Sequence, residues 1–98
     1  MKILAIEKEV PGVPDDAFAP HLRDEAARAW KLHQAGVIRE LYFRDDWPGA
    51  VLMLECEDLR AAEEALASLP LVRHGLIRFE LVPLRAYPGF ARLFANAE

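Results

Sequence analysis

The order in which hydrophobic periodicity changes along this chain is the feature that most limits its possible folds. Apolar residues first follow an extended pattern, then recur at three- and four-residue spacing, and later return to the extended pattern around a turn. A second helical segment and a last strand complete the series. The expected elements are a strand at 2–9, a helix from Asp15 and Asp16 to Ala35, strands at 37–44 and 50–57, a helix from Asp58 to about Leu69, and a strand at 76–84.

This β-α-β-β-α-β order predicts an α+β chain with the ferredoxin-like fold. Right-handed crossovers place both helices on one face of a four-stranded antiparallel-type sheet, with spatial strand order 4-1-3-2. With 98 residues, the chain is long enough for one domain, which we expect to span residues 1–98. Residues 86–98 form a tail too rich in apolar residues for a free terminus.

The two helices are expected to begin and end at recognisable residues. Pro20 falls in the first turn of the first helix, and Gly36 follows its last residue. Asp58 caps the second helix, and Pro70 stops it. The face of the first helix that we expect to point inward consists of Phe18, Leu22, Ala26, Ala29, Trp30 and His33.

The face of the sheet opposite the helices is also apolar. The first strand offers Ile3 and Ala5 on one side and Leu4 and Ile6 on the other, whereas a solvent-facing strand would alternate with polar residues. No helix is left in the sequence to cover this second face. We therefore expect a second copy of the chain to pack there, giving a homodimer or a higher homo-oligomer, with the tail packed on the partner subunit.

Composition argues against several classes of partner. With 12 basic and 16 acidic residues the net charge is −4, and no cluster of lysine or arginine favours nucleic acid or an anionic membrane surface. No apolar run is long enough to span a bilayer. The single Cys56 fits a reducing, cytoplasmic location. Neither a glycine-rich phosphate loop nor metal-ligand spacing is present, so we expect no cofactor and no metal.

Three segments resemble the muconolactone isomerase-like group of dimeric α+β barrels and the related YciI-like proteins. They are the helix end and strand at 34–44, the segment Leu66–Leu71, and the stretch Arg85–Pro88. The resemblance implies a tight dimer with a cofactor-independent pocket for a small organic molecule between sheet and helices. The loop 45–49, the leucine-rich strand at 50–57 and the aromatic tail depart from the isomerase pattern.

A proton shift needs a group that takes and returns a proton, and a donor that stabilises the enolate oxygen. We expect the catalytic groups to be His21 or Glu7 as base, with Arg39 or Tyr42 as donor. Glu55 is a candidate substrate-binding residue. Strands 2–9 and 50–57 are expected to lie side by side and parallel, so that Glu7 and Glu55 lie next to each other at the strand ends. Two carboxylates in such a position can share a proton. Solvent-exposed strand tips are the alternative for both glutamates.

Three further residues are candidates for substrate binding. Trp30 and His33 share the inward stripe of the first helix, and Trp47 lies in the hairpin loop, where an aromatic side chain can close a pocket. Packing roles are the alternative for all three. Arg39 and Tyr42 have an alternative too, because charged residues also protect an edge strand against aggregation.

The leading hypothesis is a muconolactone isomerase-like enzyme that transfers a proton on a small unsaturated or lactone-type substrate. The alternatives are a non-catalytic ligand-binding or assembly module and a cofactor-free monooxygenase. An apolar cavity of roughly 300 Å³ or more with at least two convergent polar groups favours an enzyme, and a filled core favours the module.

Overall fold

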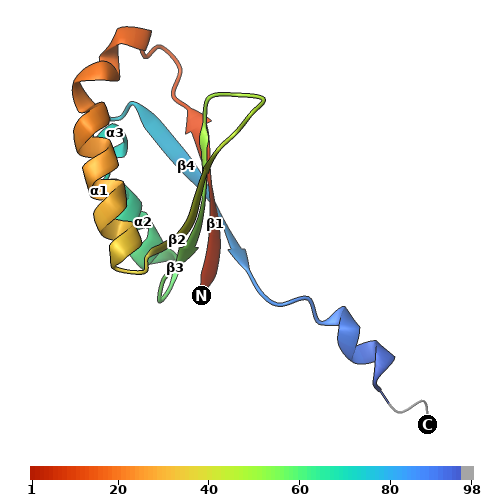
Figure 1. Cartoon of the computed structure of the whole chain (residues 1–98). Coiled ribbons are helices and arrows are strands. Elements are labelled where there is room, and N and C mark those ends of the chain that lie inside the picture. The colour runs from red at the N-terminus through yellow and green to blue at the C-terminus, as the bar shows by residue number, and fades with distance from the viewer. Residues whose placement is uncertain (96–98) are drawn as a thin grey trace.

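The four strands form one sheet with all the α-helices on one of its faces, in a computed structural model that describes residues 1–95 (Figure 1). Its strand order is β2-β3-β1-β4, and all neighbouring strands are antiparallel. The strands are β1 (Lys2–Glu9), β2 (Ile38–Phe43), β3 (Ala50–Glu55) and β4 (Ile77–Leu84). The predicted α+β ferredoxin-like fold and its strand order are confirmed.

The relative direction of β1 and β3 differs from the expectation. The two strands are antiparallel, with Lys2 opposite Glu55 and Ile6 opposite Val51. The crossover through the first helix makes β2 parallel to β1, and the hairpin then reverses the chain, so β3 must run against both. Glu7 and Glu55 therefore lie near opposite ends of the paired strands, and the prediction that they lie next to each other is wrong.

The first helix begins later than predicted. Two short 3₁₀ turns, η1 (Asp15–Ala17) and η2 (Ala19–His21), precede α1 (Leu22–Gln34). Pro20 lies inside η2, where its missing N–H and its ring favour a short turn over a continuous α-helix. At the other end Gly36 has the positive φ, 80°, expected of a residue that ends a helix.

The second helical segment is divided in two. The helix α2 (Leu59–Ala67) starts as predicted, because the Asp58 Oδ1 atom accepts a hydrogen bond from the backbone N–H of Ala61 at 2.8 Å. Pro70 does not only stop this helix but also begins a short further one, α3 (Pro70–Arg73). Proline suits a first helical position because that residue needs no N–H partner.

The face that α1 turns toward the sheet is offset from the predicted stripe. Leu32 is its buried residue, 5% exposed, whereas Trp30 is 59% exposed and His33 is exposed as well. The inward stripe includes Leu22, Ala26, Ala29 and Leu32. Trp30 lies two residues before the buried Leu32, about 160° away around the helix, and His33 lies one residue after it, about 100° away. The expectation that Trp30 and His33 point inward is wrong for this reason.

The core lies between the sheet and the helices, and its members alternate along the strands. Ile3 and Ala5 of β1 and Leu52 and Leu54 of β3 are almost completely buried. Ala62 and Leu66 of α2 and Leu69 cover them. The strand neighbours on the opposite face are only half-buried; they are Leu4, Ile6, Val51, Met53 and Val82.

The chain after β4 leaves the rest of the molecule. It runs away from the sheet into the 3₁₀ turn η3 (Gly89–Leu93), and no described helix covers the sheet face opposite α1 and α2 (Figure 1). The apolar side chains of this tail are exposed, up to 85% for Phe94. Residues 96–98 of the expected tail lie outside the described residues.

Candidate functional site

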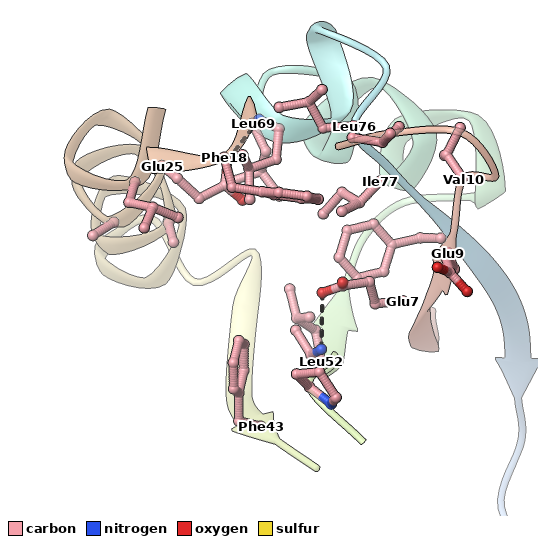
Figure 2. Close-up of a pocket in the computed structure, with 18 of the residues that line it drawn as sticks. Glu7, Glu9, Val10, Phe18, Glu25, Phe43, Leu52, Leu69, Leu76 and Ile77 are labelled. Carbon is pink, nitrogen blue, oxygen red and sulfur yellow. Dashed lines mark hydrogen bonds between the residues drawn. The ribbon is translucent and has the colours of Figure 1, made fainter. Parts of the chain in front are cut away.

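A cavity of about 520 Å³ opens between the helical face of the sheet and the chain around the start of α1 (Figure 2). Phe18 and Leu22 line it from the helical side, and Leu41 and Phe43 line it from β2. The space exists because α1 presents small side chains, Ala26 and Ala29, where larger ones would fill the gap. The cavity exceeds the roughly 300 Å³ typical of the smallest ligand sites.

Glu7 is a polar group of the cavity wall and the catalytic candidate that the structure places there. It follows Ile3 and Ala5 on the helix-facing side of β1 and is half-buried. One of its carboxylate oxygens accepts a hydrogen bond from the backbone N–H of Ala50 at 2.9 Å (Figure 2). Burial raises the pKa of Glu7, and the hydrogen bond from Ala50 opposes that rise only in part. The carboxylate is therefore a stronger base than an exposed one.

Glu25 is the second half-buried carboxylate of the cavity, and the sequence analysis did not identify it. It projects from α1, and its Oε1 atom accepts a hydrogen bond from the backbone N–H of Leu71 at 2.9 Å. Burial raises the pKa of Glu25, partly offset by the Leu71 hydrogen bond, and the negative charge of Glu7 adds to the rise. The sequence held a signal for Glu25, because it lies three residues after Leu22 and four before Ala29, on the inward stripe.

Of the residues proposed for the site, Glu7 and Trp47 line the cavity. Trp47 reaches it from the hairpin loop. His21 lies just before α1, and its ring stacks on that of His74 at a centroid distance of 4.4 Å. His33 and Trp30 form a tilted ring pair at 5.6 Å, and the His33 Nδ1 atom lies 3.0 Å from the carbonyl oxygen of Ile38.

Arg39, Tyr42 and Glu55 are found in other contacts. The Arg39 Nε–H donates to the carbonyl oxygen of Gly36 at 2.6 Å, and the Tyr42 hydroxyl donates to Glu40 at 2.8 Å. Glu55 accepts a hydrogen bond from the N-terminal ammonium at 2.6 Å. The structure therefore brings Glu7, Trp47 and Glu25 to one cavity. The side chains of Arg39, Tyr42 and Glu55 are not among those that line it.

The described chain contains neither a cluster of potential metal ligands nor a membrane-spanning helix. Within residues 1–95, no group of three or more histidine, cysteine, aspartate or glutamate side chains is arranged to hold a metal ion. None of the helices in this part of the chain is long and apolar enough to cross a membrane.

The two cavity carboxylates predict a pH dependence of stability. A group whose pKa is raised by folding binds its proton more tightly in the folded state, so stability falls as pH rises through the ordinary pKa of 4.5 toward the raised value. Glu25→Gln removes one such group. The free energy of unfolding is measured by urea titration from about pH 4 to about pH 7. The value for the variant minus the value for the wild type should increase as pH rises. A difference that is constant with pH would contradict the raised pKa of Glu25.

Two solved structures share this arrangement of strands and helices. Muconolactone isomerase is 21% identical over 90% of this chain and 92% of that chain, with a TM-score of 0.70. The second is a 5-chloro-2-hydroxyhydroquinone dehydrochlorinase from Burkholderia phenoliruptrix in complex with 2,5-dihydroxybenzoquinone. It is 18% identical over 91% of this chain and 98% of that chain, with a TM-score of 0.62. No protein-family model matches the chain, and no curated protein matches it. The expected muconolactone isomerase-like fold is confirmed.

Proposed function

We propose that this protein is a cofactor-independent enzyme that transfers a proton within a small unsaturated or lactone-type substrate. The observation that carries the proposal is a half-buried carboxylate, Glu7, on the wall of an otherwise largely apolar cavity of about 520 Å³. Support comes from the two structural neighbours, because both are named as enzymes of small organic molecules, one of them an isomerase.

Glu7 acts as the base in this proposal. Its carboxylate takes a proton from the carbon γ to the carbonyl group, and the electron pair of that C–H bond moves through the double bond to the carbonyl oxygen. The resulting carboxylic acid returns the proton to the α carbon, so the double bond moves and no atom is gained or lost. The Ala50 N–H holds the carboxylate in place, and the apolar wall strengthens it as a base.

Glu25 is the cavity residue suited to contact the carbonyl oxygen of the same substrate. Its pKa is raised, so it keeps a proton to higher pH than an exposed glutamate does. While it holds that proton it can donate a hydrogen bond to the carbonyl oxygen, and at higher pH it is a second carboxylate of the cavity. The roles first considered for Arg39 and Tyr42 as donors are thereby assigned to a residue of the cavity itself.

The proposed enzyme is a homodimer that packs sheet against sheet. The open face carries half-buried Leu4, Ile6, Val51, Met53 and Val82, a continuous apolar surface over three strands. A stable interface buries about 800 Å² on each partner. In the proposed dimer this area comes from contacts between the two sheets and from the exposed aromatic residues of the tail, packed on the partner subunit.

Deuterium incorporation tests the proposed chemistry. With an unsubstituted five-membered unsaturated lactone in D₂O, we expect the protein to speed the exchange of the γ protons, followed by proton NMR. Glu63→Gln, which changes an exposed carboxylate on α2, should exchange at the wild-type rate. If neither this lactone nor an uncharged cyclic enone exchanges faster than in buffer, the enzyme proposal fails and the ligand-binding module is favoured. Oxygen uptake with a phenolic substrate would instead indicate the monooxygenase.

A further inference from the structure

The charge of the cavity lining has one sign. Among the described residues that line the cavity, the ionisable side chains are Glu7, Glu9, Asp15 and Glu25, and no lysine, arginine or histidine is among them. Glu7 and Glu25 lie half-buried among apolar side chains, which keep part of the solvent away from both. Coulomb interactions are stronger in such surroundings than in water.

Two cationic side chains lie beside the cavity without lining it. Lys8 and Arg44 line an adjoining, smaller recess of about 200 Å³, whose other lining residues, Glu7, Glu9 and Trp47, also line the cavity. The guanidinium of Arg44 is paired with Asp46 at 2.8 Å, and the Lys8 ammonium lies 4.0 Å from Glu80. Each cation thus lies near a carboxylate outside the cavity, and neither is among the residues that line the cavity.

We propose that the cavity admits uncharged ligands and excludes carboxylates and other anions. The inference rests on the proposed function only in placing the ligand in this cavity. Once the pH is high enough to ionise both Glu7 and Glu25, an anion that enters the cavity loses its hydration and meets two carboxylates instead of a counter-ion, so desolvation and repulsion both oppose its binding. The substrate class is thereby narrowed to uncharged carbonyl compounds, such as unsaturated lactones, enones or esters without a free acid group.

A pair of probes that differ in charge but little in shape tests the selection. Methyl benzoate and benzoate are titrated calorimetrically into the full chain at about pH 7.5, where benzoic acid is ionised. We expect the ester to bind at least about tenfold more tightly, which corresponds to about 1.4 kcal/mol. Equal affinities, or tighter binding of benzoate, would overturn the inference and leave the proposed enzyme standing. If neither probe binds, the cavity is not a ligand site, and both the inference and the proposed function fail.

Variants separate repulsion from the general preference of an apolar cavity for an ester. Glu25→Gln and Glu7→Gln keep the size of each side chain and remove its charge, so each should narrow the ratio of the two affinities about threefold or more, through tighter benzoate binding. The affinity for methyl benzoate should change less than about twofold. Glu63→Gln should leave the ratio at its wild-type value. A ratio unchanged in both cavity variants would show that the carboxylates do not select against anions.

Discussion

Replacing Glu7 by glutamine should slow the exchange of the lactone γ protons about a hundred- to ten-thousandfold, because the amide cannot take a proton. The fold should be preserved, since the side-chain oxygen of glutamine can still accept the hydrogen bond from the Ala50 N–H. Exchange rates are measured by proton NMR in D₂O at a series of lactone concentrations, so that a loss in kcat is distinguished from a change in KM.

Two further variants make the Glu7 result specific. Glu7→Asp keeps a carboxylate but withdraws it from the cavity by one methylene, so its rate should fall between those of the wild type and Glu7→Gln. Glu63→Gln serves as the matched change outside the cavity and should retain the wild-type rate. A Glu7→Gln protein that is folded by circular dichroism and still exchanges at the wild-type rate would exclude Glu7 as the base.

The fold could be predicted from the sequence because its strand patterns are simple. In β1, Ile3 and Ala5 are buried against the helices while Leu4 and Ile6 lie on the open face, as alternation along a strand requires. The start of α2 was equally predictable, since Asp58 caps it. In these segments local chemistry and the final packing favour the same structure.

The errors arose where a local pattern allows more than one arrangement. Pro20 is compatible with the first turn of an α-helix, but here it lies in a 3₁₀ turn, and α1 begins only at Leu22. Trp30 fits a loosely spaced apolar stripe, yet the stripe that includes Leu22, Ala29 and Leu32 leaves it exposed. The antiparallel pairing of β1 and β3 follows from the path of the chain through the first crossover and the hairpin together, which no single segment specifies.

The candidate site was predicted only in part, for a related reason. Glu7 was identified from its place late in β1, but its acidic neighbour in the cavity is Glu25 of α1 rather than Glu55 of β3. An inward charge on a helix is easily missed when only apolar residues are counted toward the buried face. The cavity itself depends on small side chains, Ala26 and Ala29, whose effect appears only when the helix is packed on the sheet.

A single charge on the open sheet face should abolish the proposed dimer. Met53 lies on the central strand β3, opposite Leu4 on one side and Glu40 on the other. In Met53→Lys, two lysines, one from each protomer, would enter an apolar interface, and each buried ion costs several kcal/mol. We expect the dissociation constant to rise at least about a thousandfold, which corresponds to about 4.1 kcal/mol. Light scattering at micromolar concentration should then give twice the chain mass for the wild type and the chain mass for the variant.

The same lysine is harmless to an isolated protomer, and this is why the Met53→Lys experiment tests association and not folding. Met53 is only half-buried in the single chain, so a lysine stem can lie along the sheet while its ammonium stays in water, near Glu40. Circular dichroism should therefore match that of the wild type. Ala67→Lys adds the same charge at an exposed position of α2 and should remain dimeric. A monomeric wild type, or a Met53→Lys protein with the wild-type mass, would show that the open face is not the dimer interface.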